Sequence, residues 1–279
     1  MAGQQLTGKE DAMETSRLKN IIIFILLLVN LFLLGILGMR RTSEFTSQRR
    51  TVQELTTLFA SDGVSLAEDA VIFQPPPVGR SLSRDAGRER ELAAFLLGEG
   101  IHRSDEGGGI CIYSNENGWV EFRSGGSFSA VGVLGSDPAA LYRRFCQNFG
   151  YESLLLEFDN AGSGSAHAVQ YADGYPVVNC TVTFFAEEGI VTAVTGACLP
   201  PAGTDSASDS TLDAATALMS FLEMRRSSGA VVSAVTGVAP CYLFQTSASA
   251  PMSLVPAWHL STDAGNFYVN CFTGAVTQS

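Results

Sequence analysis

The sequence predicts an α+β fold, in which an N-terminal transmembrane helix precedes two units that each combine a helix with an antiparallel sheet. Three observations support this fold class. Residues 21–38 form one apolar run, apolar residues recur at helical spacing after it, and the segments between the expected helices alternate with a period of two. With 279 residues, of which 46% are apolar, the chain can bury one or two modest cores.

The apolar run Ile21–Gly38, IIIFILLLVNLFLLGILG, contains no charged residue. At about 1.5 Å per residue, a helix of this length reaches about 27 Å, close to the ~30 Å hydrocarbon core of a bilayer. Arg40 and Arg41 follow almost directly, without the small-residue site of a cleaved signal peptide. A lipoprotein signal needs a nearby cysteine, and the first is Cys111. We therefore expect an uncleaved single-span anchor over residues 21–39.

Basic residues flank both ends of this anchor, so their count does not decide its orientation. All six cysteines follow the anchor, and an even number is compatible with disulfides outside the cytoplasm. We expect a cytoplasmic tail over residues 1–20 and an extracytoplasmic C-terminal domain, which makes this a single-pass protein of the cell membrane. Asn30 is either a tolerated polar residue or a hydrogen-bonding contact to a partner's transmembrane helix.

The charge of the chain argues against nucleic-acid binding. The net charge is −11, and no lysine occurs after Lys19. Because nucleic-acid affinity comes largely from cationic neutralisation of phosphates, the external domain would be repelled by such a ligand.

Residues 40–105 are expected to form a juxtamembrane stalk and an N-terminal external region. Apolar spacing predicts a helix over residues 51–59, and the proline run in QPPPVG (74–79) breaks the chain. A further helix is expected where Leu92 and Leu96 share one face, before Gly98 ends it.

The two α+β units are expected at residues 106–198 and 209–279. In the first, Asn117-Gly118 predicts a hairpin turn, and Asp137-Pro138 predicts a helix start. In the second, Ser210 and Asp213 predict a capping box. The linker Leu199–Ser210, LPPAGTDSASDS, separates the units, and each unit closes in a strand, an acidic turn containing glycine, and a strand.

The closing segment VPAWHLSTDAGNFYVNCFTGAV (255–276) gathers a histidine, an aspartate, two asparagines and a cysteine. A four-residue loop over 263–266 pairs Trp258 with Cys271 and His259 with Asn270. This register collects Trp258, Leu260, Phe267, Val269 and Cys271 on one apolar face. Cys271 is therefore expected to be a structural core residue, and the outer face, with His259, Tyr268 and Asn270, is the candidate contact face for a partner.

A loop at Glu187–Gly189 in the other hairpin places Cys180 opposite Gly196, and Cys198 diagonal to Cys180 on the same face. A Cys180–Cys198 disulfide is therefore one candidate pairing, and free thiols are the alternative.

No catalytic motif is present: G-x-S-x-G, H-E-x-x-H, a P-loop and G-x-G-x-x-G are all absent, as are paired C-x-x-C ligands for a metal. The sequence therefore predicts a protein that is not an enzyme and that binds no metal and no cofactor.

Four segments resemble the YycI family: SRLKNIIIFILLLVNLFLL, LFASDGVSL to ELAAFLLG, YADGYPVVNCTVTFFAEEGIVTAVTG and LVPAWHLSTDAGNFYVNCFTGAV. The two units also resemble PepSY modules, in which a helix packs on an antiparallel sheet. The resemblance covers most of the chain from about Arg17, although six cysteines are unusual for the YycI family. It implies a membrane-anchored regulator that modulates a sensor histidine kinase of a cell-wall two-component system. Its implied partners are the kinase, a sister regulator of the YycH type and the membrane.

Two other functions stay open at this point. A PepSY-like anchored module could bind or inhibit a secreted peptidase or peptide. An anchored thiol hydrolase using Cys271 is the weaker alternative, because neither exposure nor a neighbouring cation is evident for that thiol.

Overall fold

The computed structural model describes residues 50–200 apart from 68 and 73, residues 203–205, 211–247 and 250–278, and the five residues 26, 27, 29, 30 and 32. The chain divides into two compact units, Met1–Thr57 and Leu58–Ser279. A helix covers residues 50–61. The sheet and the other helices lie in the second unit.

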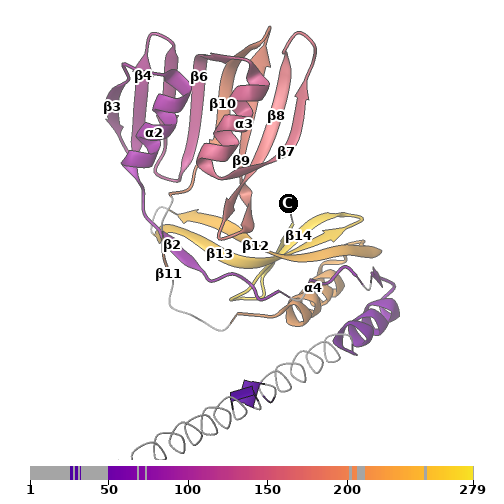
Figure 1. Cartoon of the computed structure of the whole chain (residues 1–279). Coiled ribbons are helices and arrows are strands. Elements are labelled where there is room, and N and C mark those ends of the chain that lie inside the picture. The colour runs from indigo at the N-terminus through magenta and orange to yellow at the C-terminus, as the bar shows by residue number, and fades with distance from the viewer. Residues whose placement is uncertain are drawn as a thin grey trace, which may run out of the picture. The chain divides into compact units, whose positions relative to one another are not determined.

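One continuous sheet of 15 strands dominates the second unit (Figure 1). Its main order is β11-β2-β13-β12-β9-β10-β6-β5-β4-β3, with β1 beside β12, β14 and β15 beyond β13, and β8 and β7 beyond β9. The strands are β1 (Ser65–Leu66), β2 (Arg80–Leu82), β3 (His102–Gly107), β4 (Ile110–Asn115), β5 (Gly118–Phe122), β6 (Ser127–Ser136), β7 (Tyr151–Phe158), β8 (Gly164–Ala172), β9 (Tyr175–Glu187), β10 (Ile190–Ala197), β11 (Gly203–Asp205), β12 (Ala234–Ser247), β13 (Ala250–Thr262), β14 (Gly265–Asn270) and β15 (Val276–Gln278).

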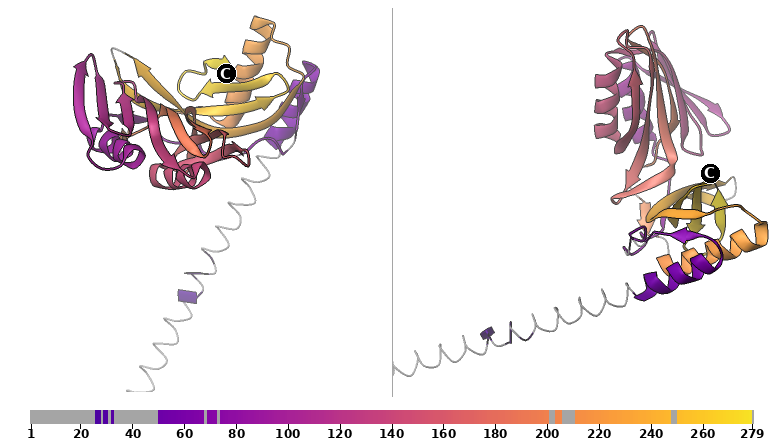
Figure 2. Two further views of the ribbon diagram at one scale, coloured as in Figure 1. Left: turned by 90° about the horizontal axis from the view of Figure 1, so that it is seen from above. Right: turned by 90° about the vertical axis from the view of Figure 1, so that its right-hand side faces the viewer.

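Two helices, α2 (Ala86–Leu97) and α3 (Pro138–Phe149), cover one face of strands β4 to β8 (Figures 1 and 2). The predicted start of α3 is confirmed, because the Asp137 side chain accepts a hydrogen bond from the Ala140 amide at 3.0 Å. Phe145 of α3 lies at the centre of an aromatic core, with its ring 4.9 Å from that of Phe149 and 5.0 Å from that of Phe184. Each helix thus buries its apolar stripe against the sheet.

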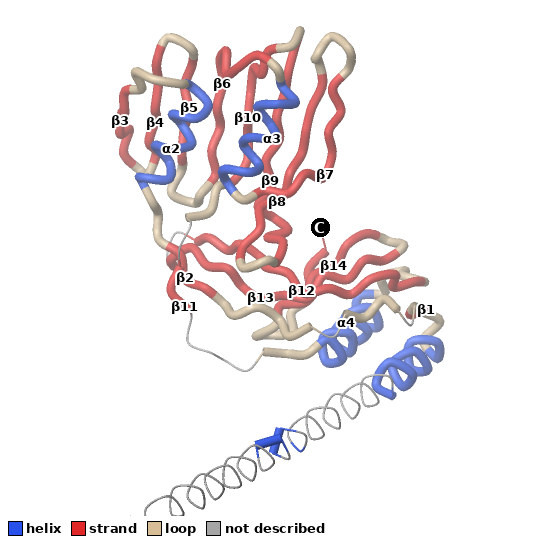
Figure 3. The backbone as a smooth tube through the Cα atoms, in the orientation of Figure 1, coloured by secondary structure: helices blue, strands red, loops and turns tan. Residues whose placement is uncertain are grey.

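The third helix of the sheet-containing unit, α4 (Ala214–Ser228), packs on β14 and β15 (Figure 3). Asp213 is its N-cap and accepts from the Thr216 amide at 2.8 Å, so it is not the third residue of a capping box that starts at Ser210. Ser210 lies outside the described residues. Trp258 is 1% exposed, and its Nε1 donates to the Leu212 carbonyl at 2.9 Å.

The expected fold class is wrong in its architecture. Strands predominate, and β12 pairs with β9 in parallel at Tyr242 and Val177, so one mixed sheet runs through both of the expected helix-plus-sheet units. No helix among the described residues is long and apolar enough to cross a bilayer. Most of the segment 21–39, on which the transmembrane prediction rested, lies outside the described residues. The segment 199–210 was expected to separate two independent units. Part of it, β11, instead joins the same sheet beside β2.

The predicted hairpin between β4 and β5 is present, but its turn is one residue earlier than expected. Asn115 pairs with Gly118, which leaves Glu116 and Asn117 as the turn. Gly118 serves another purpose: a Cβ there would lie 2.2 Å from the Val131 carbonyl oxygen, so only glycine fits this close approach to β6.

Candidate functional site

The proposed contact face of the closing hairpin is half-buried. Thr262 pairs with Gly265 across a two-residue turn, so His259 lies opposite Tyr268 and their rings stack with centroids 5.1 Å apart. Asn270 lies opposite Ala257, and its side-chain oxygen accepts from the Phe272 amide at 2.8 Å. His259 Nε2 is buried without a hydrogen-bond partner among the described residues. These three side chains share one face, as predicted, and their contact with a partner stays a prediction.

The expected apolar face of the same hairpin is confirmed, although its register is shifted by two residues. Trp258 pairs with Val269 and Leu260 with Phe267. A shift of two preserves which side chains share a face, so Cys271 is fully buried as expected. Burial raises the pKa of the Cys271 thiol to about 12. A thiol with that pKa is almost entirely protonated at neutral pH, which makes it a poor nucleophile.

Cys180 and Cys198 are free thiols in the structure. Gly196 pairs with Val182, and continuing this register by two residues brings Cys198 opposite Cys180 rather than diagonal to it. The Cys180 thiol donates to the Ala197 carbonyl at 3.3 Å. Burial raises the pKa of the Cys198 thiol to about 11 and raises that of Cys180 as well. The two sulfurs are therefore neighbours, and their oxidation to a disulfide stays a prediction.

Asn30, the candidate contact within the predicted anchor, is exposed and donates to the Leu26 carbonyl at 3.0 Å. This bond satisfies one of the two amide N–H groups within the helix. A contact to a partner's transmembrane helix stays a prediction.

A cavity of about 340 Å³ that the sequence did not indicate lies where β2, α2, the end of α3, the β8–β9 turn and β13 meet. Arg80 of β2 lies on one side, with Nε 2.6 Å from Asp173 Oδ2 and Nη1 3.5 Å from Asp205 Oδ1. The hydrogen bond to Asp173 raises the pKa of Arg80. Other members of the lining are Gln147, Phe149, Gln170, Leu199 and Leu254, which make the cavity part polar and part apolar. We call this cavity the arginine cleft.

Arg88 of α2 is the second arginine of the cleft. Its guanidinium lies 4.5 Å from the centre of the Phe149 ring, and Nη2 donates to the Asn148 carbonyl at 3.2 Å. Arg88 Nε is buried without a hydrogen-bond partner among the described residues. An arginine donor without an acceptor beside a cavity suits a ligand that carries a carboxylate.

Gln170, 5% exposed, forms the floor of the arginine cleft. Its Oε1 accepts from the Leu199 amide at 2.9 Å and from the Cys180 thiol at 3.2 Å, and its Nε2 donates to the Phe149 carbonyl at 3.2 Å. This buried amide of β8 thus connects two other parts of the cleft lining, the end of α3 at Phe149 and the segment at Leu199.

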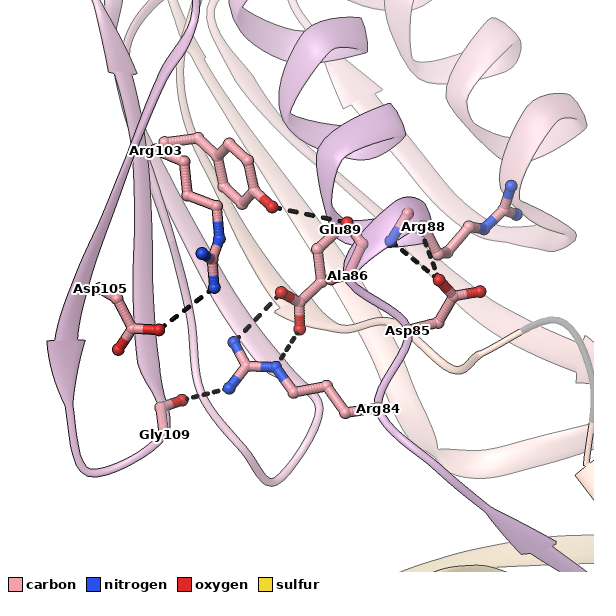
Figure 4. A network of polar contacts seen from close by, with 10 residues as sticks. Arg84, Asp85, Ala86, Arg88, Glu89, Arg103, Asp105 and Gly109 are labelled. Atoms are coloured by element: carbon pink, nitrogen blue, oxygen red, sulfur yellow. Dashed lines mark hydrogen bonds and ion pairs between the residues drawn. The ribbon is translucent and has the colours of Figure 1, made fainter.

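A network of ion pairs supports the helix that carries Arg88 (Figure 4). Arg84 binds both oxygens of Glu89, at 2.6 and 3.1 Å, and donates to the Gly109 carbonyl at 2.7 Å. Asp85 caps the helix by accepting from the Arg88 amide at 3.1 Å. Figure 4 shows the Arg88 side chain pointing away from the Arg84–Glu89 pair. We interpret this network as structural, since it fixes the start of α2. Arg88 takes no part in it through its side chain, and instead pairs with Glu91, with Nη1 3.2 Å from Oε2.

The face of the sheet opposite α2 and α3 carries a row of apolar side chains. Trp119 of β5 pairs with Val131 of β6, Val131 with Ala193 of β10, and Ala193 with Phe185 of β9. Trp119, Val131 and Phe185 are 39%, 41% and 45% exposed. We call these four residues the apolar row. Val133, two residues from Val131, enlarges the same surface and is 61% exposed.

Within the described residues, no group of three or more histidine, cysteine, aspartate or glutamate side chains is placed to hold a metal ion. Neither the arginine cleft nor the apolar row was predicted from the sequence. The row could be found from strand alternation once the pairing order was known, whereas the cleft has no signal in any short stretch.

No family model matches the chain, and no curated protein matches its sequence. Among solved structures, the chain is similar to an uncharacterized protein from Eubacterium rectale, with 9% identity, 77% of this chain and 90% of that chain covered, and a TM-score of 0.44. It is also similar to the C-terminal domain of YpeB from Bacillus megaterium, with 12% identity, 71% of this chain and 98% of that chain covered, and a TM-score of 0.37. These TM-scores are too low to establish a shared fold or function, and membership of the YycI family stays a prediction.

Proposed function

We propose that this chain is a non-enzymatic regulator that acts by contact with other proteins outside the cytoplasm, at the cell membrane. The resemblance to the YycI family supplies the proposed partners, a sensor histidine kinase of a cell-wall two-component system and a sister regulator of the YycH type. The contact role itself rests on the surface of the sheet.

The apolar row is the observation that carries this proposal. Its members come from four neighbouring strands and form one contiguous surface on the face that lacks α2 and α3. Contiguous exposed apolar surface favours a protein interface, because burying it against a partner removes it from water. Trp119 and Phe185 supply the aromatic side chains that are enriched at such interfaces.

A regulator of this kind changes kinase activity only if it binds one kinase conformation more tightly than another. The sheet that carries the apolar row is held rigid by the aromatic core beneath it, around Phe145. A rigid apolar face can distinguish two conformations of a partner, because it binds only the conformation in which the partner exposes a matching apolar surface.

Site-specific photocrosslinking in native membranes tests the proposal. A photoreactive side chain at Trp119 or Phe185 should capture a histidine kinase or the sister regulator. The same probe at Val231, an isolated valine that is 86% exposed, is the control and should capture neither. Crosslinks from the apolar row that never contain either protein would contradict the proposal.

The arginine cleft favours a second candidate, a module that binds a peptide or inhibits a secreted peptidase. A carboxylate of a peptide would accept from Arg88, and an apolar neighbour would lie against Phe149 or Leu254. Acidic peptides should then bind the full chain in the absence of any kinase, and Arg88→Gln should weaken this binding. Arg90→Gln, on an exposed position of the same helix, is the matched control. Equal binding by both variants would exclude the cleft as the peptide site.

A further inference from the structure

Strand β7 is an open edge of the sheet. It pairs with β8 on one side, and within the described residues no strand pairs with its other side. Figures 1 and 3 show it at the margin of the strands that carry α2 and α3. Such an edge presents unpaired backbone N–H and C=O groups that can bind another strand.

The opposite edge of the same sheet is protected, whereas β7 is not. That edge, β3, reads HRSDEG, and all of its residues are exposed. Charged side chains on an edge strand discourage the addition of a further strand. β7 reads YESLLLEF, and its three leucines, Leu154, Leu155 and Leu156, are 61%, 42% and 40% exposed.

The exposed leucines of β7 are not part of the hydrophobic core. Leu155 lies opposite His167 on the open face, and Leu156 lies opposite Ala166 on the helix-covered face. A bulge at Leu154 interrupts the ladder with β8 and turns this side chain outward. The strand therefore offers apolar contacts on both faces as well as a free backbone edge.

Two glutamates flank the leucines. Glu152 and Glu157 are both exposed. Glu157 lies opposite Ser165, which lies opposite Phe185, so the line of paired residues that contains the apolar row reaches the edge of the sheet at Glu157. An added strand would therefore meet an apolar centre between two negative charges, at the end of the surface already proposed for partner contact.

We propose that β7 is a docking edge to which an extended segment of a partner protein adds as a further strand, and that this segment carries basic residues on both sides of an apolar centre. The inference rests on the proposed contact function and names the chemistry of the segment that the partner supplies. Backbone hydrogen bonds provide the affinity, and the charges opposite Glu152 and Glu157 provide the selectivity.

A second copy of this chain is a poorer occupant. Antiparallel self-pairing over the full strand places Glu152 opposite Glu157 twice, and like charges directly opposite each other destabilise a pair of strands. The net charge of −11 adds a further repulsion between two copies.

The test uses the purified full chain and three labelled seven-residue peptides in fluorescence anisotropy. The first has the order Thr-Lys-Val-Ile-Val-Lys-Thr. The bulge at Leu154 puts Glu152 and Glu157 on the same face, opposite Val169 and Ser165, so lysines four residues apart lie opposite both glutamates in either strand direction. The second has glutamate in place of both lysines, and the third has proline in place of the central isoleucine. The lysine peptide should bind about tenfold more tightly than the glutamate peptide, because two attractive cross-strand charge pairs take the place of two repulsive ones. The proline peptide should not bind, because it lacks a backbone donor.

Variants of the chain assign the binding to β7. Glu152→Lys combined with Glu157→Lys should reverse the preference in favour of the glutamate peptide, whereas Glu106→Lys on β3, the matched control, should leave it unchanged. Leu154→Lys should weaken the binding of the lysine peptide. Far-ultraviolet circular dichroism should show that each variant is folded. Because Leu154 is the exposed residue of a bulge, this change does not disturb the core.

Three outcomes would overturn the inference: equal affinity for the lysine and glutamate peptides, no saturable binding below about 1 mM, or a concentration-dependent dimer that Leu154→Lys abolishes. Failure here is distinguishable from failure of the proposed function. Photocrosslinks from the apolar row can capture the kinase even if no strand adds to β7.

Discussion

Arg226 near the end of α4 binds both carboxylate oxygens of Asp62, with Nε 2.6 Å from Oδ2 and Nη2 2.9 Å from Oδ1. The neighbouring Arg225 donates to the Asp62 carbonyl at 3.2 Å. The pair thus fastens the turn at Asp62 to a helix 164 residues further along the chain. The hydrogen bond from Arg226 lowers the pKa of Asp62 below its ordinary value of 3.8.

Asp62→Asn should lower the melting temperature at pH 7 slightly, because the exposed ion pair is lost. A depressed folded-state pKa contributes stability that is present above the unfolded pKa and is lost as the pH falls through the folded pKa. The difference between the variant and the parent should therefore shrink as the pH falls below 3.8, and disappear once the carboxyl is protonated in the folded state as well. Thermal unfolding followed by circular dichroism checks this, with Asp69→Asn, an exposed aspartate, as the control. A difference that persists in acid would contradict the assignment.

Gln170→Leu should destabilise the fold by about 2–4 kcal/mol, because the buried Leu199 amide and Phe149 carbonyl lose their partner. Urea unfolding measures this cost. Gln147→Leu, at an exposed position of the same cleft, is the matched control and should change stability by less than about 0.5 kcal/mol. Equal costs for the two variants would show that Gln170 does not hold the cleft walls.

Trp258→Phe should cost about 1–2 kcal/mol, chiefly from the lost hydrogen bond to the Leu212 carbonyl. Trp258→Ala also removes the buried ring and should cost about 3–5 kcal/mol. Chemical denaturation of both variants separates the hydrogen bond from the packing. Similar losses for both would mean that the hydrogen bond, and not the ring, supplies the stability at this position.

Cys180 and Cys198 should form a disulfide when the folded chain is treated with oxidised glutathione. The two thiols transfer two electrons and release two protons, and the glutathione disulfide is reduced to two thiols. Opposed residues of an antiparallel pair have Cα atoms about 4.5–5.5 Å apart, within the range of a disulfide. Oxidation should be faster at pH 9 than at pH 7, because the pKa of Cys198 is about 11 and a larger fraction is thiolate at pH 9.

Mass spectrometry after alkylation in denaturant counts the remaining thiols. Four free thiols of the six in the chain are expected after oxidation, and Cys198→Ser should prevent the reaction. Six alkylated thiols in the oxidised parent chain would contradict the prediction.

Strand alternation correctly predicted which side chains share a face of the sheet, but it did not predict which residues lie opposite each other in neighbouring strands. The burial of Trp258, Leu260 and Cys271 depends only on the alternation of side chains between the two faces. It was therefore predicted correctly although the loop after Thr262 is two residues shorter than expected. Loop length is decided by the twist of the flanking strands and by the turn type, and neither the aspartate nor the glycine at 263–265 distinguishes a two-residue turn from a four-residue loop.

The arginine cleft could not be predicted, because Arg80 and Arg88 meet only through the arrangement of distant elements. The continuity of the sheet escaped prediction for a similar reason. Tyr242 and Val177 form a single parallel pair between β12 and β9, and one pair leaves no periodic trace in the sequence.

Strand β9 is shared by two hydrophobic clusters. Val182 and Phe184 lie in the core beneath α2 and α3, whereas Val177 and Cys180 lie in a separate core with Tyr242 and Leu254. A chain cut in the linker at 199–210 would separate at least three buried members of the second cluster, Leu82, Val177 and Cys180, from the rest, while leaving the first cluster intact. The two halves therefore could not be exchanged as independent modules, either by a protein engineer or by recombination between genes.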